Sequence, residues 1–160
     1  MTSKDYSTIN FIVCVDGSAS SKAALRFACL KAKNHGGTVN MLYVVEPVDF
    51  QSISSVAEAM LEEQIQEGKK ILDHLANEME DNLAIRPTGI LLPGKVGEEI
   101  IKQTNQMAGN PAMLVLGVIQ DSHNVGKLVA WVCAQIGNSI KLPVMLVPGN
   151  LSDDEMLALA

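Results

Sequence analysis

The sequence predicts an α/β domain in which an open sheet of five parallel strands lies between two layers of helices. Three observations support this fold class. Short, strongly apolar segments alternate with longer helical segments along the whole chain. Turns rich in glycine and proline separate these segments. The 160 residues suffice for one domain with a sizeable core. Alternating strands and helices of this kind form Rossmann-like sheets with right-handed crossovers.

The first strand and the first helix meet at a sharp corner. Phe11–Val15 is a run of apolar residues, which is typical of a strand covered on both faces. An Asp-Gly pair starting at Asp16 ends this strand. Either Ser18 or Ser20 can cap the helix predicted at Ala19–His35, because a serine hydroxyl accepts hydrogen bonds from free backbone N–H groups. In open α/β sheets, ligands bind at such corners.

The later elements follow from periodicity and from turn residues. Apolar residues at steps of three and four define a long helix whose other side is acidic. Paired acidic residues suit the first turn of the third helix, and Ser152-x-x-Glu155 has the spacing of a capping box that starts a short final helix. The predicted elements are a strand at Thr38–Val45, a helix at about Ser52–Asn82, a strand at Ala84–Leu92, a helix beginning near Glu98, a strand at Ala112–Val118, a helix marked by Leu128 to Ile140, and a strand at Pro143–Val147.

Composition excludes several classes of function. The formal charge of −6 argues against nucleic acids and anionic membrane surfaces as partners. No apolar run approaches the ~18 residues of a membrane span, and the first residues have no hydrophobic targeting core. The three cysteines form no metal-binding pattern with the histidines, so we expect buried thiols in a reducing cytoplasm. These cysteines are Cys14, Cys29 and Cys133.

Several stretches of the sequence match known functional motifs only in part. Gly89-x-x-x-x-Gly94-Lys95 matches most of a phosphate-binding loop, but Val96 replaces the hydroxyl residue that would hold Mg²⁺. The intervening residues also favour a strand. The chain lacks the acidic residues of a response-regulator receiver and the G-x-S-x-G elbow of α/β hydrolases. The first-corner serines suggest a flavodoxin-like phosphate loop, but no aromatic pair is placed to sandwich a flavin.

The remaining motifs resemble the universal stress protein family. They are the VDGS corner, the strand end LYVVE, the segment PGKVGEEI, and the ending LVLG followed by LPVMLVP. The resemblance covers Phe11 to Pro148. It implies a bacterial protein of the cytoplasm. The implied fold is adenine nucleotide alpha hydrolase-like, with strand order 3-2-1-4-5. It also implies a domain at residues 1–148, with a tail at 149–160. Family members are usually dimeric and regulatory rather than clearly catalytic, and many bind ATP.

The resemblance assigns a nucleotide pocket. It implies that Asp16 and Val44 lie where adenine is held, and that Leu116 and Gly117 lie beside the nucleotide at the end of the fourth strand. Asp16 also has a purely structural interpretation, since a carboxylate at a strand end can accept backbone N–H groups of the turn. Both roles stay open from the sequence.

The phosphate signature of the family is degenerate here. The pattern G-x-x-G, nine residues, then G-[S/T] starts at Gly117, but its later positions hold Gln120, Ala130 and Trp131. Glycines at such positions let backbone N–H groups approach phosphates. Trp131 removes the hydroxyl and adds an indole, which either fills the phosphate site or, as we favour, packs on the core or a dimer partner. We therefore expect ATP binding to be weak or absent and no cofactor to be required.

The loop before the fourth helix offers a replacement anion site. Ser122, Asn124, Gly126 and Lys127 supply donors or positive charge, whereas Asp121 opposes a triphosphate. We interpret His123 as a surface residue rather than as a ligand.

Three functions are weighed for the whole chain. The first is a non-enzymatic stress-response protein, with protein partners unknown, that pairs as a homodimer through the edge strand Leu142–Pro148. The acidic helix Ser52–Asn82 and the tail are candidate surfaces for other partners. The second is an ATP-binding switch, with weak ATPase activity as an open possibility. The third is an enzyme on another small molecule, with Asp16, Glu46 or His123 as general base.

Overall fold

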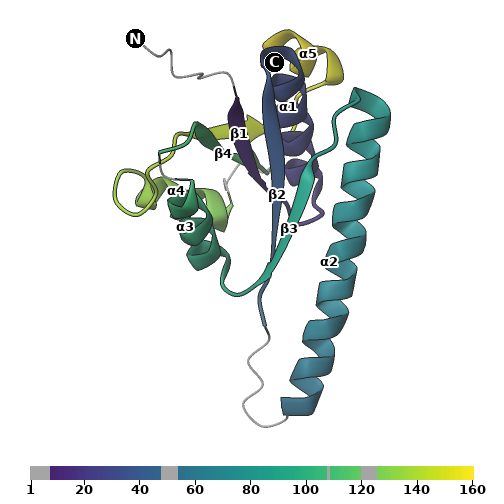
Figure 1. The fold of residues 1–160 in the computed structure, drawn as a ribbon, viewed down its shortest axis with the longest axis vertical. Helices are drawn as coiled ribbons and strands as arrows, with labels where there is room; N and C mark the ends of the chain where they lie inside the picture. Colours follow the sequence, from purple (N-terminus) through teal and green to yellow (C-terminus); the bar gives the residue numbers. More distant parts are fainter. Residues whose placement is uncertain (1–7, 48–53, 108, 120–125) are drawn as a thin grey trace.

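Five parallel strands form one sheet in the order β3-β2-β1-β4-β5, as the sequence predicts (Figure 1). The computed structural model describes residues 8–47, 54–107, 109–119 and 126–160. The elements are β1 at Ile9–Cys14, α1 at Ala19–His35, β2 at Gly37–Val45, α2 at Ser54–Leu83, β3 at Thr88–Pro93, α3 at Val96–Gln106, β4 at Ala112–Val118, α4 at Lys127–Gln135, β5 at Val144–Pro148 and α5 at Asp153–Leu159.

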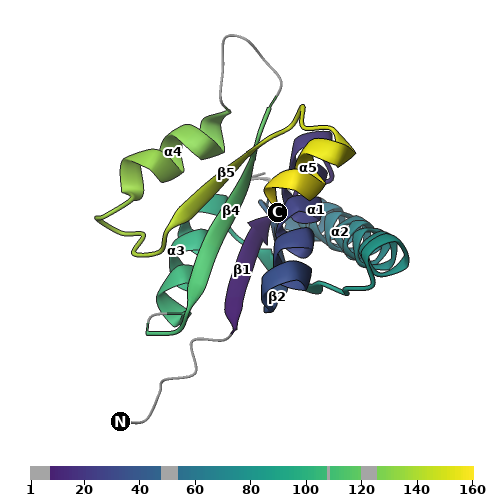
Figure 2. The same cartoon turned by 90° about the horizontal axis from the view of Figure 1, so that it is seen from above.

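Helices cover both faces of the sheet. α1, α2 and α5 lie on one face, and α3 and α4 lie on the other (Figure 2). The central strand β1 supplies both cores, because successive side chains of a strand point to opposite faces. Phe11 and Val13 are buried with α1 and α2, whereas Ile12 is buried with α3 and α4. The prediction of a strand covered on both faces is confirmed.

Two predicted boundaries are wrong. α2 runs to Leu83, and Ala84 then takes a positive φ of 56°, so no strand begins there. The strand starts only at Thr88, because Pro87 lacks the N–H that a strand ladder needs. α4 likewise ends at Gln135 instead of reaching Ile140.

A turn explains the early end of α4. Gly137 has a φ of +80°, which breaks the helix, and Ile136 and Ile140 form an isolated parallel bridge instead. Ile140 is still buried, while Ile136 is 47% exposed. Apolar spacing therefore predicted burial for Ile140 correctly, although it predicted the wrong local structure.

The long helix α2 is only partly packed on the sheet. In its second half the predicted stripe is confirmed, since Leu72, Leu75 and Met79 are buried. In its first half, Leu61 and Ile65 are only half-buried, and this half extends past the ends of the strands (Figure 1).

The tail forms the short helix that its capping box predicts. Ser152 accepts a hydrogen bond from the backbone N–H of Glu155, and the Glu155 side chain accepts one from Ser152 N–H. Met156 is 3% exposed and belongs to the core on the α1 side. Within the described ranges, no helix has the length and apolar character needed to cross a bilayer.

Candidate functional site

A crevice of about 690 Å³ opens at the carboxyl ends of β1, β2 and β4, between the first turns of α1, α3 and α4. All six residues that the sequence analysis assigned to a nucleotide pocket line it: Asp16, Val44, Leu116, Gly117, Gly126 and Lys127. Their convergence follows from topology, because the carboxyl ends of parallel strands meet at one edge. Their role in binding stays a prediction.

Asp16 is fixed by the corner that follows β1. Its Oδ1 accepts a hydrogen bond from Ser18 N–H at 2.9 Å, and Ser18 Oγ caps α1 by accepting from Ser21 N–H at 3.2 Å. Burial alone would raise the pKa of the Asp16 carboxyl, but hydrogen bonds from Ser18 and Ser21 outweigh burial and hold that pKa below its usual range. The structural role that the sequence left open is therefore present. An ionised carboxylate also lines the crevice.

Gly117 lets β4 approach the start of α1. A Cβ atom at this position would overlap the carbonyl oxygen of Ser20. The glycine is therefore required by the packing of one backbone on another, whether or not a ligand is present. The same approach brings Ser20 into the crevice wall.

Trp131 lines the crevice beside the start of α3. Its Cζ2 atom lies 2.7 Å from where a Cβ of Gly97 would stand, so the indole packs on the first turn of α3. Trp131 is half-buried against the core on the α3 side and lines the crevice as well. Of the two roles considered for this ring, packing on the core is observed.

The sequence analysis missed the wall that α3 contributes. Lys95, Gly97 and Glu98 all line the crevice. Glu46 Oε1 accepts a hydrogen bond from Val96 N–H at 3.0 Å, which holds the start of α3 against the end of β2. Lys95 belongs both to the incomplete phosphate loop and to the segment PGKVGEEI, and this second pattern is the signal that could have placed it at the site. The proposed anion site is described only at Gly126 and Lys127, since residues 120–125 lie outside the described residues.

The charges around the crevice balance. Among its described lining residues, Lys95 and Lys127 are formally positive and Asp16 and Glu98 are formally negative. Most of the remaining wall is aliphatic or aromatic, including Leu42, Val44, Leu116, Leu128 and Trp131. The described part of the wall is therefore largely apolar, and its formal charges cancel.

The three cysteines differ in burial, contrary to the prediction that all are buried. Cys29 is buried and Cys14 is half-buried, but Cys133 is exposed on α4, so the expectation of three buried thiols is wrong for Cys133. Burial, with the nearby Asp16 charge, raises the pKa of the Cys14 thiol to about 12.

Among the described residues, no group of three or more His, Cys, Asp or Glu side chains is placed to hold a metal ion.

Comparison with known proteins agrees with this architecture. The family model described as "Universal stress protein family" matches residues 9–148. The chain belongs to the universal stress protein family. No curated protein matches it in sequence.

Solved structures of universal stress proteins share the fold. UspA from Lactobacillus plantarum has a TM-score of 0.73 at 19% identity, covering 87% of this chain and 97% of its own. A family protein from Arabidopsis thaliana with AMP bound has a TM-score of 0.62 at 18% identity, covering 92% and 94%. A universal stress protein in complex with cAMP has a TM-score of 0.62 at 18% identity, covering 88% and 97%. At these identities the likeness establishes the fold of this universal stress protein.

Proposed function

We propose that this universal stress protein is a non-catalytic regulatory protein that acts as a homodimer through protein contacts, and that its crevice no longer holds a triphosphate tightly. The observation that carries the proposal is the packing of Trp131 on Gly97. It places a bulky ring where the family pattern has a small hydroxyl residue. A phosphate there would lose both a hydroxyl donor and the space to approach the backbone.

Electrostatics support the same conclusion. ATP carries close to four negative charges at neutral pH, whereas the described wall of the crevice has no net formal charge. Asp16 and Glu98 would repel part of the phosphate chain that Lys95 and Lys127 attract. A ligand of lower charge avoids most of this repulsion.

The second candidate is therefore an adenine nucleotide with a single phosphate group. Two structural neighbours were solved with AMP or cAMP. The crevice keeps an aliphatic wall at Val44 and Leu116 and an ionised carboxylate at Asp16, which suit an apolar base and a ribose hydroxyl. This candidate differs from the first only in that the crevice is occupied when the protein acts.

Dimerisation is proposed at the β5 edge. β5 pairs only with β4 among the described strands, so its outer backbone groups are available to another chain. Leu146 at its centre is 41% exposed. A free apolar edge of this kind pairs readily with its counterpart in a second subunit.

Calorimetric titration of the nucleotide-free protein tests the pocket. We expect no saturable heat with ATP at sub-millimolar concentration, and more binding of ATP by Trp131→Ser, which removes the ring and restores the hydroxyl. Trp131→Phe keeps a ring and serves as the control. Tight ATP binding by the unmodified protein contradicts the proposal, and saturable AMP binding that Asp16→Ala abolishes selects the second candidate.

Native mass spectrometry of the same sample tests dimerisation, because it reports the number of subunits. A monomer contradicts pairing through β5.

A further inference from the structure

We propose that the free edge of β3, together with the neighbouring side of α2, docks an extended peptide segment of another protein as a sixth strand of the sheet. This site lies away from the crevice and from the β5 edge. It does not depend on the function proposed above.

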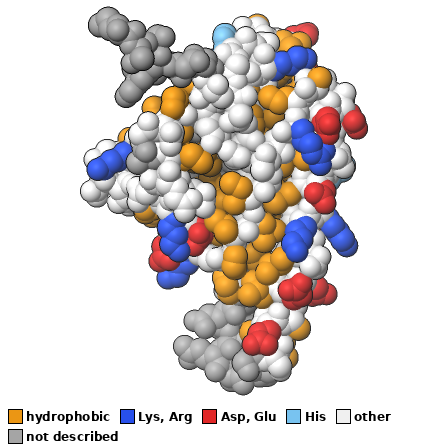
Figure 3. Space-filling view, in the orientation of Figure 1, with side chains coloured by type: hydrophobic (Ala, Val, Ile, Leu, Met, Phe, Trp, Pro, Cys, Tyr) orange, Lys and Arg blue, Asp and Glu red, His pale blue; other side chains and the backbone are white. Residues whose placement is uncertain are grey.

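The β3 edge is available and weakly protected. β3 is the last strand on its side of the sheet, and its register with β2 runs from Asn40↔Thr88 to Val45↔Pro93. No described strand pairs with its other side. Prolines bound this edge, with Pro87 before the strand and Pro93 at its last position, but Thr88 to Leu92 between them contains neither a charge nor a proline, the two devices that usually block an edge. Figure 3 shows apolar side chains gathered on this face of the molecule, with charged side chains beside them.

A groove of about 550 Å³ runs between this edge and α2. On the strand it is lined by Thr88, Gly89 and Leu91, of which Gly89 and Leu91 lie on one face of the sheet. On α2 it is lined by Leu72 and Ala76, one helical turn apart. Because the groove lies between α2 and the last strand of the sheet, we infer that side chains of one further strand would enter it.

Gly89 adapts the strand to this arrangement. A Cβ atom at Gly89 would lie 3.2 Å from Cδ1 of Leu72, so the glycine lets the helix pack closely on the strand. It also leaves the exposed backbone of β3 without a side chain at this point. Glycine in a strand often marks a position where another backbone approaches.

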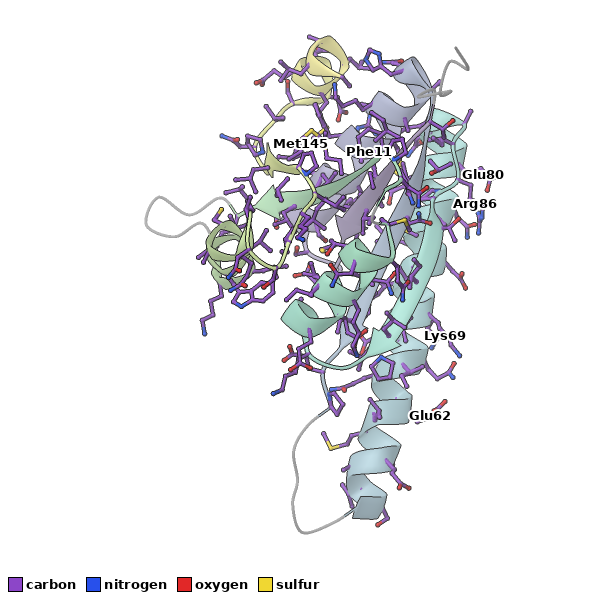
Figure 4. The ribbon with its side chains drawn as sticks, turned by 60° about the vertical axis from the view of Figure 1, so that its left-hand side comes forward. Phe11, Glu62, Lys69, Glu80, Arg86 and Met145 are labelled. Atoms are coloured by element: carbon purple, nitrogen blue, oxygen red, sulfur yellow. The ribbon has the colours of Figure 1, made fainter. Side chains whose placement is uncertain are left out.

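Two charged residues at the rim of the groove indicate the kind of occupant. Lys69 and Asp73 both line it, and neither has a hydrogen bond or an ion pair with any described residue. Arg86 also lines it, but Arg86 donates to Glu80 at 2.6 Å and to Asn77 at 2.8 Å and is therefore engaged. Figure 4 shows Arg86 beside Glu80, whereas Lys69 projects from α2 toward solvent.

The spacing of these charges matches a strand. Four residues of helix rise about 6 Å, which separates Lys69 from Asp73 along α2. Alternate residues of a strand are about 6.6 Å apart and point to the same face. A peptide with one acidic and one basic residue at alternate positions therefore places each charge opposite its complement.

A second copy of this chain does not meet that requirement. The edge strands that a copy would offer are Thr88–Pro93 and Val144–Pro148, and neither contains a charged residue. A copy docked by either strand would leave Lys69 and Asp73 without complements. The occupant is thus an extended segment of a different protein.

Fluorescence anisotropy with synthetic peptides tests the site. The probe is a labelled pool with the pattern x-Glu-x-Lys-x, where x is Val, Ile or Thr, and the control pool places Glu and Lys at adjacent positions. We expect saturable binding of the first pool only. Lys69→Glu should weaken binding of the alternating pool about five- to tenfold. The variant should instead favour a pool of pattern x-Lys-x-Lys-x, because both facing residues are then acidic. Lys70→Glu, on an exposed neighbour that does not line the groove, should leave binding unchanged.

Three outcomes overturn the proposal. The first is no saturable binding of the alternating pool by the folded protein. The second is binding that Lys69→Glu and Lys70→Glu weaken equally, since this would reflect general charge. The third is a change in oligomeric state on Lys69→Glu, measured by light scattering, because it would show that a second copy occupies the β3 edge.

Discussion

The two faces of the sheet are built differently. Twenty of the described residues are buried in the core between the sheet and α1, α2 and α5, whereas eight are buried in the core under α3 and α4. Around the second core, Val44, Leu128 and Trp131 are only partly buried, and they line the crevice. Most of the buried core therefore lies on one face of the sheet, and the crevice lies on the other.

Helix length differs between the two faces in the same sense. α1 and α2 have 17 and 30 residues, while α3 and α4 have 11 and 9. The longer helices offer more side chains to bury against the sheet, which is consistent with the larger core on their side.

Truncating one leucine on each face gives the largest expected contrast. Leu25 is fully buried in α1, and Leu25→Ala should reduce the free energy of unfolding by about 2–5 kcal/mol. Leu128 lies at the crevice wall, and Leu128→Ala should cost only about 1 kcal/mol because part of the side chain already contacts water. Urea unfolding measures both. Equal losses would show that the α3 side contributes as much stability as the α1 side.

A smaller effect is expected where the crevice meets α1. Gly117→Ala forces β4 and the start of α1 apart, at a cost of about 2–3 kcal/mol, because the new methyl group overlaps the Ser20 carbonyl. Thermal unfolding at neutral pH measures the loss. Gly109→Ala is the control: no atom lies within 4 Å of its added methyl, so only its φ of +84° should cost stability, about 1 kcal/mol. A Gly117→Ala protein as stable as the control would contradict this close approach.

Thiol reactivity gives the finest comparison. Burial raises the pKa of Cys14, in the crevice, and of Cys29, in the larger core, to about 12 in each case. At pH 8 roughly one in ten thousand of these thiols is ionised, so neither should react with iodoacetamide while exposed Cys133 does. Below pH 12 the Cys14 rate should rise about tenfold per pH unit. Peptide mass spectrometry follows each site. Fast labelling of Cys14 at pH 8 would mean that the crevice admits far more water than its burial indicates.

The sequence predicted the architecture well because its signals are local. Buried parallel strands require continuous apolar runs, and Phe11–Val15 has one. The errors arose where apolar residues continue past the end of an element. The predicted strand began at Ala84 and the predicted helix reached Ile140, but the backbone turns at Ala84 and at Gly137. Apolar spacing reports burial, and it does not report where a chain changes direction.

For the site, the sequence predicted which residues converge but not what holds them. All six assigned residues line the crevice, since they end neighbouring strands or begin a helix. Lys95 and Glu98 were missed, because their place depends on how α3 packs against β2. The contact between Trp131 and Gly97 joins two helices far apart in sequence. No local pattern encodes that contact.

The final helix changes where the folded unit ends. The family model stops at residue 148, yet Met156 is buried in the core with α1, and Arg26 of α1 pairs with Asp153 at 3.3 Å. His35, at the last position of α1, contacts the backbone oxygen of Ala160 at 2.7 Å. The last dozen residues therefore pack along the side of α1 and are held there by these contacts. Any fusion partner or tag attached at Ala160 would begin next to α1, so a spacer is needed there to preserve the packing of α5 on α1.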